Sequence, residues 1–227
     1  MKEILAKICP ELSAEQLERF QTYFDMLTDW NTRMNLTAIV EPEEVARKHF
    51  ADSLAARNLI PDGAKLIDVG TGAGFPGVPL LIANPTLKVT LLDGLNKRIT
   101  FLQTLLAELG LSAECVHARA EDAGQNPLYR GKFDVATTRA VASLPVLAEL
   151  TVPLLKVGGR SIAYKGDAAE ELTGSKGALH LLHARAESVD VPADYGMRTL
   201  VVLTKKEPTP KTYPRRAGMP EKKPLGI

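Results

Sequence analysis

The sequence predicts an α/β fold built on a mostly parallel β-sheet, and three observations point to it. A short apolar run that contains one acid, Asp68, leads into a glycine-rich turn, after which a second apolar run begins at Val78. Strand-like and helix-like segments then alternate through the middle of the chain. Two short strand-like runs near the end have the spacing of a hairpin. Together they predict the kind of sheet on which nucleotide-binding proteins are built.

The glycine-rich turn after the first strand fits two ligand-binding patterns. From Gly72, the pattern G-x-G-x-x-G is the dinucleotide fingerprint, in which a pyrophosphate lies on a helix N-terminus. From Asp68, the pattern D-x-G-x-G-x-G is typical of S-adenosylmethionine-dependent methyltransferases. Both patterns require an acid at the end of the second strand, and Asp93 lies 19 residues past Gly74, close to the roughly 20 expected. The turn alone therefore leaves both ligands open.

The later elements are placed from periodicity and from glycine. We predict strands at residues 91–93, 114–117, 133–138 and 160–164, helices at 99–109 and 144–154, and a closing hairpin of 188–191 and 199–204 with its turn at 192–196. Gly110 is placed to end the first of these helices, and Gly158 and Gly159 separate the second from the next strand. Ligand-binding residues lie at the carboxyl ends of such strands. A terminal hairpin is typical of methyltransferases and not of dinucleotide dehydrogenases.

The first 60 residues have the pattern of a helical extension. Ser13 and Gln16 form a capping box, and apolar residues at helical spacing follow it. A second helix is expected to start near Glu43 and to carry His49, which on general grounds is more often a packing residue than a catalyst. We therefore divide the chain into an extension packed on the core (1–60), the core itself (61–207) and a basic, proline-rich tail (208–227).

Composition predicts a single enzyme-sized unit without a membrane segment. The chain has 227 residues and 45% hydrophobic content, enough for one sizeable core. No apolar run approaches the roughly 20 residues needed to span a bilayer, and the N-terminus has no secretory signal. Cys9 and Cys115 have no metal-ligand spacing around them, so we expect no metal site. The expected location is the cytoplasm.

The charge of the chain is unevenly distributed. The formal net charge is +1, yet residues 208–227 contain five cations and one acid, so the rest of the chain is acidic. The same tail contains five prolines, from which we predict an extended, non-helical segment. Composition alone favours a solvated, disordered terminus. The alternative is a segment that follows an RNA phosphate backbone.

Several short motifs, in order along nearly the whole chain, resemble those of the bacterial glucose-inhibited division protein B family, the small-subunit ribosomal RNA guanine-N7 methyltransferases. The most specific are the His49-x-x-Asp52-Ser53 element and the tail from Tyr213 to Gly218. The other matching pieces are Trp30-Asn31, Asn35-Leu36-Thr37, Lys97-Arg98, Arg119-Ala120-Glu121, Arg139-Ala140, Lys165-Gly166 and Arg198-x-Leu200.

The resemblance implies a class I S-adenosylmethionine-dependent methyltransferase fold, Rossmann-like, with a seven-stranded sheet and a terminal antiparallel hairpin. It also implies that a monomer transfers a methyl group to N7 of guanine 527 in 16S ribosomal RNA, either free or in an assembling subunit, and that the tail contacts this RNA. The cofactor-binding residues that it implies are Gly70, Gly72, Gly74, Phe75, Asp93, Ala120, Glu121 and Arg139. The substrate-side candidates are Asn35, His49, Arg119, Lys165 and Arg198.

The chemistry of guanine N7 needs no general base, because this nitrogen has an exposed lone pair and no proton. Catalysis should then come mostly from alignment of the two reactants. The end of the fourth strand, Thr138-Arg139, lacks the Asn/Asp-Pro-Pro-aromatic signature of exocyclic-amine methyltransferases. We expect Arg139 to hold the cofactor carboxylate or an RNA phosphate. Two alternatives remain: a nicotinamide-dependent oxidoreductase and a non-catalytic RNA-binding protein.

Overall fold

The computed structural model describes residues 1–139, 142–192 and 198–226. The predicted turn at 192–196 therefore falls almost entirely outside the described residues, as does Ala140 of the Arg139-Ala140 pair. A seven-stranded sheet has the order β3-β2-β1-β4-β5-β7-β6. Its strands are β1 (Lys65–Val69), β2 (Lys88–Asp93), β3 (Glu114–His117), β4 (Phe133–Arg139), β5 (Leu155–Lys165), β6 (Ala184–Val191) and β7 (Arg198–Lys205).

The strand directions confirm the predicted fold class. Strands β1 to β5 pair in parallel, whereas β7 runs antiparallel to both β5 and β6. The strand order reverses between β1 and β4, so the carboxyl ends of these two strands flank the position where open α/β sheets bind ligands. This is the mostly parallel sheet with a terminal antiparallel hairpin that the sequence predicts.

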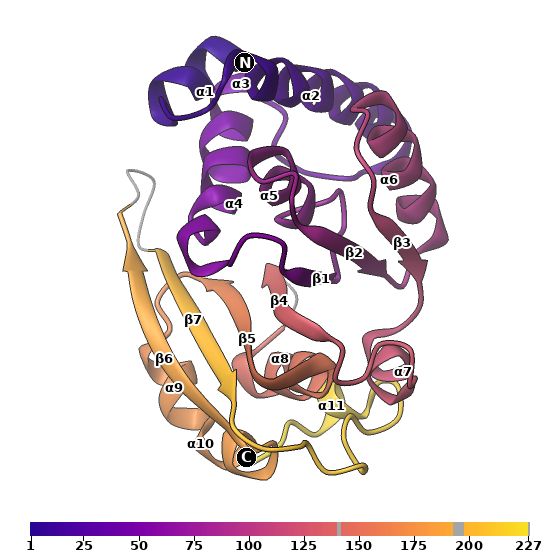
Figure 1. Ribbon diagram of the computed structural model, residues 1–227, viewed down its shortest axis with the longest axis vertical. Helices are drawn as coiled ribbons and strands as arrows, with labels where there is room; N and C mark the ends of the chain where they lie inside the picture. Colours follow the sequence, from indigo (N-terminus) through magenta and orange to yellow (C-terminus); the bar gives the residue numbers. More distant parts are fainter. Residues whose placement is uncertain (140–141, 193–197, 227) are drawn as a thin grey trace.

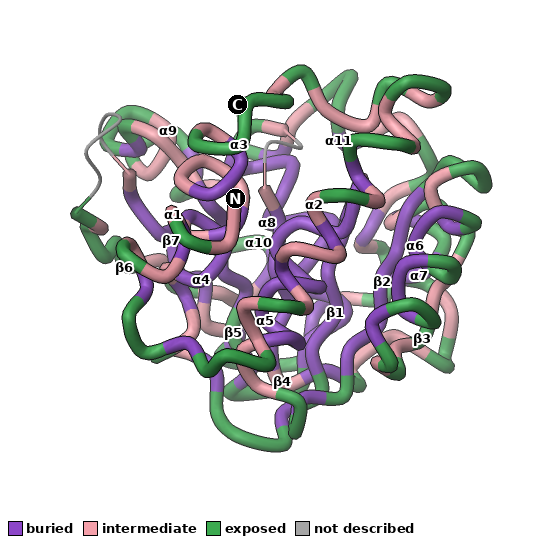
Figure 2. The backbone as a smooth tube through the Cα atoms, turned by 90° about the horizontal axis from the view of Figure 1, so that it is seen from above, coloured by how far each residue is buried: buried purple, intermediate pink, exposed green. Residues whose placement is uncertain are grey.

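Helices cover both faces of the sheet (Figure 1). On one side lie α1 (Lys2–Ile8), α2 (Ala14–Met34), α3 (Pro42–Glu44), α4 (Asp52–Leu54), α5 (Gly77–Ala83) and α6 (Asn96–Glu108). On the other lie α7 (Ala120–Gln125), α8 (Leu144–Thr151), α9 (Ala169–Gly174), α10 (Lys176–Leu181) and α11 (Met219–Lys222). The central strands are buried between these layers and the connecting loops are exposed, as Figure 2 shows.

The helical extension begins as predicted. The Ser13 hydroxyl accepts from the Gln16 N–H and the Gln16 side chain accepts from the Ser13 N–H, which completes the capping box of α2. The Gln16 amide also donates to the carbonyls of Ile82 and Ala83 and so ties α2 to the end of α5. Phe20, Tyr23 and Leu27 are buried on the inner face of α2, in the same hydrophobic cluster as the sheet.

Some boundaries differ from the sequence prediction. Strand β5 begins at Leu155 and passes through Gly158 and Gly159, which the sequence assigns to a turn. The β4–β5 register is irregular here, and a Cβ on Gly159 would lie 3.0 Å from the Asp134 carbonyl oxygen, so the strand needs glycine to pass. Helix α8 ends at Thr151 and continues as a 3₁₀ turn, because Pro153 cannot donate a helical hydrogen bond. Helices α1, α7, α9 and α10 have no counterpart in the prediction.

The prediction that the tail is non-helical is wrong for α11. Pro220 lies in the first turn of that helix, where its missing N–H has no intrahelical partner to lose. The tail also packs on the core: Pro220 and Leu225 are buried, and α11 lies against α8 (Figure 1). Among the described residues, no helix is both long and apolar enough to cross a bilayer.

Gly74 should be the least replaceable glycine of the turn. Its φ is +105°, and a Cβ there would lie 2.6 Å from the Tyr23 hydroxyl and 2.9 Å from Val78. Gly63 has a similar left-handed φ of +69° but open space around it. In urea unfolding, Gly74→Ala should cost at least about 3 kcal/mol and Gly63→Ala about 1–2 kcal/mol. Equal losses would contradict the close packing of Tyr23 on the turn.

Candidate active site

The glycine-rich turn is held by one buried carboxylate. Asp68, at the end of β1, is fully buried, and its Oδ2 accepts from the Thr71 hydroxyl (2.6 Å) and the Gly77 N–H (3.0 Å). Its Oδ1 accepts from the Thr137 hydroxyl of β4 at 2.9 Å. Burial raises the pKa of Asp68 from 3.8 to about 6, although the three hydrogen bonds oppose that shift. Asp68 thus fixes the turn and is not itself free to bind a ligand.

Asp93, at the end of β2, holds the turn from the opposite side. It is 3% exposed, and it accepts from the Gly72 N–H (2.9 Å), the Leu95 N–H (2.9 Å) and the Arg98 guanidinium (3.2 Å). A carboxylate offers about four acceptor positions, so about one remains for a ligand. The sequence predicts an acid at the end of the second strand. In the structure this acid, Asp93, also fixes the glycine-rich turn through Gly72.

The first of two hollows lies over the ends of β1 and β2 and is called the Asp93 hollow. Its volume is about 180 Å³, and Gly70, Asp93, Arg119, Ala120 and Glu121 line it together with apolar residues of α8. Gly70 and Gly72 have φ of +69° and +61°, and a Cβ on Gly72 would meet nothing nearer than the Gly70 carbonyl oxygen at 4.0 Å. A wall residue without a side chain and a carboxylate with about one unused acceptor position suit a ligand that presents hydroxyl groups.

Two predicted cofactor residues have packing roles in the structure. The Phe75 ring is 6% exposed and stacks between Tyr23 (centroids 5.3 Å apart) and His49 (4.5 Å). Tyr23 donates its hydroxyl to the Ala73 carbonyl at 2.6 Å, so helix α2 holds the turn from outside. Gly74 is needed because Tyr23 approaches it closely. Neither Phe75 nor Gly74 lines the Asp93 hollow.

The second hollow, called the His49 hollow, lies where helix and sheet meet beyond β4 and β5. Its volume is about 400 Å³. The charged residues Lys48, Asp52, Arg139, Lys165 and Arg198 line it together with His49, Ile39, Tyr164 and Gly166. Three substrate-side candidates, His49, Lys165 and Arg198, therefore come together here with Arg139. Arg139 lines the His49 hollow, and Ala142 lines the Asp93 hollow. The undescribed residues 140 and 141 lie between them in the sequence.

His49 is held as a neutral ring with an assigned tautomer. Its Nδ1 lies 3.2 Å from Nη2 of Arg139, which can only donate, so Nδ1 accepts and carries no proton. Its Nε2 lies 2.8 Å from the Thr37 hydroxyl and carries the proton. Burial, with the adjacent Arg139 charge as a smaller cause, lowers the pKa of His49 from 6.5 to about 4. The ring is therefore neutral at physiological pH.

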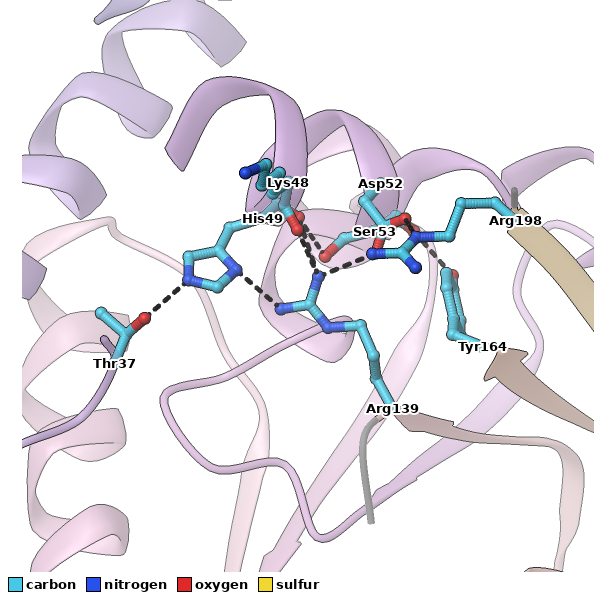
Figure 3. A network of polar contacts seen from close by, with 8 residues as sticks. All are labelled: Thr37, Lys48, His49, Asp52, Ser53, Arg139, Tyr164 and Arg198. Carbon is cyan, nitrogen blue, oxygen red and sulfur yellow. Dashed lines mark hydrogen bonds and ion pairs between the residues drawn. The ribbon is translucent and has the colours of Figure 1, made fainter. Parts of the chain in front are cut away.

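Arg139 connects the end of β4 to the helical extension, as Figure 3 shows. Its Nη1 donates to the carbonyls of Lys48 (3.0 Å) and His49 (3.4 Å), in a π-helical segment, Val45–Ala51, and to Oδ2 of Asp52 (3.0 Å). Asp52 is 5% exposed, and its Oδ1 accepts from Nε of Arg198 at 3.0 Å. The guanidinium of Arg139 also lies 4.8 Å from the centre of the Phe75 ring. These protein contacts hold Arg139 at the boundary of sheet and extension, and its expected contact with a cofactor carboxylate or an RNA phosphate stays a prediction.

Of the remaining candidates, Lys165 lines the His49 hollow and Arg119 the Asp93 hollow, whereas Asn35 lines neither. Lys165 is 13% exposed, pairs with Glu171 at 2.8 Å and donates to the Ala142 carbonyl at 2.7 Å. Arg119 is exposed beside Asp93. Asn35 ends α2 in a left-handed conformation and is exposed, away from the residues that line the His49 hollow.

Sequence reasoning missed four residues that organise the His49 hollow. The Asn31 side chain donates to the Thr37 carbonyl and accepts from the Thr37 N–H, both at 2.9 Å. The Thr37 hydroxyl in turn binds His49. Asp52 joins Arg139 to Arg198, and Tyr164 donates to the Ser53 carbonyl at 2.7 Å. Asn31, Thr37 and Asp52 all belong to the motifs quoted from the sequence, so presence in a motif was the available signal. Their partners were not deducible from it.

The fold and the two hollows define a protein of the class I methyltransferase type. A methyltransferase from Pyrococcus furiosus matches 84% of this chain and 99% of its own with a TM-score of 0.57 and 14% identity. An S-adenosylmethionine-dependent O-methyltransferase from Thermotoga maritima matches 80% of this chain and 71% of its own with a TM-score of 0.53 and 17% identity. At such identities the likeness concerns the fold alone.

The chain belongs to the rRNA small subunit methyltransferase G family, whose model matches residues 16–198. A ribosomal RNA small subunit methyltransferase G from Desulfitobacterium hafniense is 50% identical over 220 residues, covering 95% of this chain and 92% of the relative. One of the same description from Streptococcus pyogenes is 50% identical over 222 residues, covering 94% and 93%. The resemblance read from the sequence motifs is thereby confirmed.

Asp68→Asn should change how stability depends on pH. The folded pKa of about 6 lies above the unfolded 3.8, so the cost of the buried charge is absent below pH 3.8 and complete above pH 6. Asparagine keeps an oxygen for Thr71 and Gly77, and the Thr137 hydroxyl can turn to accept from the amide. Relative to wild type, the variant should gain about 3 kcal/mol in urea unfolding between about pH 4 and pH 7.5. A difference independent of pH would contradict this account.

Proposed function

We propose that this protein transfers a methyl group from S-adenosylmethionine to N7 of a guanine in 16S ribosomal RNA, guanine 527 by family resemblance. It acts as a monomer in the cytoplasm on the RNA or the assembling small subunit. The observation that carries the proposal is the pair of hollows on either side of the end of β4, one built around Asp93 and one lined by four cations and the neutral His49. The family assignment favours methyl transfer over the hydride transfer that the glycine pattern also permits.

The residues of the Asp93 hollow fit the methyl donor. Asp93 keeps about one acceptor position for a ribose hydroxyl. Gly70 lines the hollow without a side chain, and a Cβ on the nearby Gly72 would meet nothing closer than 4.0 Å. The apolar side chains of Val69, Leu92 and Val146 supply a surface for a flat ring. When bound, the donor supplies an electrophilic methyl group on a sulfonium. The chain's own residues bind it and orient it.

Among the described residues that line the His49 hollow, neither His49 nor Asp52 is set up as a base, which suits an acceptor without a proton. The Nδ1 lone pair of His49 already accepts from Arg139, and its Nε2 proton is donated to Thr37. The carboxylate of Asp52 is paired with both Arg139 and Arg198. Alignment of guanine N7 with the donor is therefore the main task of these residues.

The charge balance of the His49 hollow matters because N7 methylation makes the purine cationic. The buried Asp52 carboxylate lies between the guanidinium groups of Arg139 and Arg198 and offsets part of their field. Glu171 pairs with Lys165 in the same way. The cations at the rim are then available to position RNA phosphates without opposing the charge that develops on the base.

The decisive experiment is to map the modified nucleotide. Unmodified 16S RNA, and small subunits that contain it, are incubated with the protein and S-adenosylmethionine, and 7-methylguanosine is located by borohydride reduction, aniline cleavage and mass spectrometry of fragments. One modified guanine, methylated at N7, is expected. Methylation at an exocyclic amine or ring carbon would overturn the assignment. Binding of the RNA without any methyl transfer would favour the non-catalytic alternative.

Asp93→Ala should weaken donor binding. The substitution removes the acceptor for the ribose and also the hydrogen bonds that hold Gly72 and Leu95. Calorimetry should show a loss of about 1.5–3 kcal/mol, or roughly 10- to 150-fold in affinity. Asp62→Ala is the matched control, because Asp62 is exposed before β1 and binds only the Asn84 side chain. Tight binding of a nicotinamide dinucleotide in place of S-adenosylmethionine would reject the proposal.

His49→Gln should not introduce a pH-dependent loss of methyl transfer. The glutamine oxygen can accept from Arg139 as Nδ1 does, and no proton has to leave N7. Single-turnover rates with saturating RNA should therefore show the same pH profile in both proteins. A loss of about 10²-fold or more at pH values where the His49 ring is neutral, the usual scale for a lost general base, that shrinks as the wild-type ring becomes protonated at low pH would show that His49 acts as one.

A further inference from the structure

The C-terminal residues 215–226 form a strap across the helices α7 and α8, seen in yellow in Figure 1. Before the strap, the guanidinium of Arg130 donates to the carbonyls of Thr209, Pro210 and Tyr213 at 2.6–3.0 Å. The Gln125 amide donates to the carbonyls of Lys211 and Pro214. The chain thus reaches the strap along a path that is held to the core by backbone hydrogen bonds, although Lys211 and Thr212 are exposed.

The strap has an ionic anchor at its beginning. Glu149 of α8 is 0% exposed and accepts from the backbone N–H of Arg215 (2.8 Å), from its Nε (2.8 Å) and from its Nη2 (2.6 Å). The same Nη2 also donates to the Lys223 carbonyl, which draws the two ends of the strap together. These contacts raise the pKa of Arg215 further above its ordinary value, chiefly through the hydrogen bonds to Glu149. Arg215 is therefore committed to the fold and is not a free phosphate ligand.

The strap ends in a second anchor. Leu225 is 7% exposed in the hydrophobic cluster formed with α8 and α10. Gly226 lies so close to Gly177 that a Cβ on Gly177 would be 2.8 Å from the Gly226 Cα. Between the two anchors, the Gly218 N–H donates to Oε1 of Glu121 at 2.8 Å.

The middle of the strap is a wall of the Asp93 hollow. Pro220, which is buried, and Glu221 line it opposite Gly70, Asp93 and Ala120. Glu121 also lines the hollow, and it is the residue that holds Gly218. One carboxylate therefore touches both the strap and the space where the ligand is expected.

We propose that this strap is part of the methyl-donor site and that Arg215 is a positioning residue, which acts by holding Pro220 and Glu221 against the Asp93 hollow. The inference rests on the proposed function and concerns how the donor is held. It changes the expectation for the basic tail, since at least one of its five cations serves the cofactor site through Glu149. The strap forms one wall of the space in which the donor binds. A bound donor should therefore stabilise the strap in its place, and a displaced strap should weaken donor binding.

Two variants test the strap with matched controls. Arg215→Lys keeps a positive charge beside Glu149 but cannot reproduce the two guanidinium contacts to it, and Arg216→Lys is the same change at the exposed neighbour. Pro220→Ala alters the wall directly, and Pro224→Ala is its control outside the hollow. Affinity for S-adenosylhomocysteine is measured by calorimetry, and the melting temperature is recorded to show that each variant is folded.

Arg215→Lys and Pro220→Ala should each weaken S-adenosylhomocysteine binding by about five- to tenfold, and the two controls by less than about twofold. In wild type, saturating S-adenosylhomocysteine should slow tryptic cleavage after Arg216 and leave cleavage after Lys7, on α1, unchanged. Folded Arg215→Lys and Pro220→Ala proteins with wild-type affinity would overturn the proposal. So would cleavage after Arg216 at the same rate with and without the ligand.

Failure of the strap and failure of the proposed function give different results. If wild type binds S-adenosylhomocysteine and the strap variants bind it less well, the strap stands even when no guanine is methylated. If wild type does not bind it, the donor assignment has failed and the strap proposal falls with it. If wild type binds and methylates while the strap variants bind equally well, only the strap proposal is wrong.

Discussion

The buried carboxylate of Asp68 is the contact on which both hollows depend. It accepts from Thr71 in the glycine turn, from Gly77 at the start of α5 and from Thr137 in β4, so one side chain joins four segments at the carboxyl edge of the sheet. Gly70, two positions after Asp68, lines one hollow, and Arg139, two positions after Thr137, lines the other. Burial opposes ionisation and raises the pKa to about 6, so these hydrogen bonds are made against a desolvation cost.

The helical extension completes the site that Asp68 begins. The Tyr23 hydroxyl of α2 donates a hydrogen bond to the Ala73 carbonyl in the turn. The Phe75 ring is stacked between Tyr23 and His49. Arg139 then joins the end of β4 to His49 and Asp52 in the extension. The glycine turn is thus held by the sheet on one side and by α2 on the other. Residues 1–60 contribute four of the nine residues that line the His49 hollow, which a sheet domain alone would leave open.

Motif reasoning located the parts of the site that depend on a strand end. Asp93, Gly70, Ala120 and Glu121 were predicted and do line one hollow, because the carboxyl ends of parallel strands meet at one edge. Phe75 was in the right segment but packs inward on aromatic rings. The tail was predicted as non-helical from its prolines. That inference failed because Pro220 stands in the first turn of α11, the one place in a helix where proline costs little.

The sequence by itself determined the strand–turn–helix unit at Asp68, the acid at Asp93, the positions of the parallel strands along the chain and the terminal hairpin. These follow from local periodicity, from glycine and from short spacings, all of which are written along the chain. Only the tertiary structure decided what the charged groups do. Arg139 meets Asp52 across 87 positions, Arg215 meets Glu149 across 66, and Glu121 meets Gly218 across 97. A charge acts on what lies within a few ångströms of it, and that neighbourhood exists only once the chain has folded.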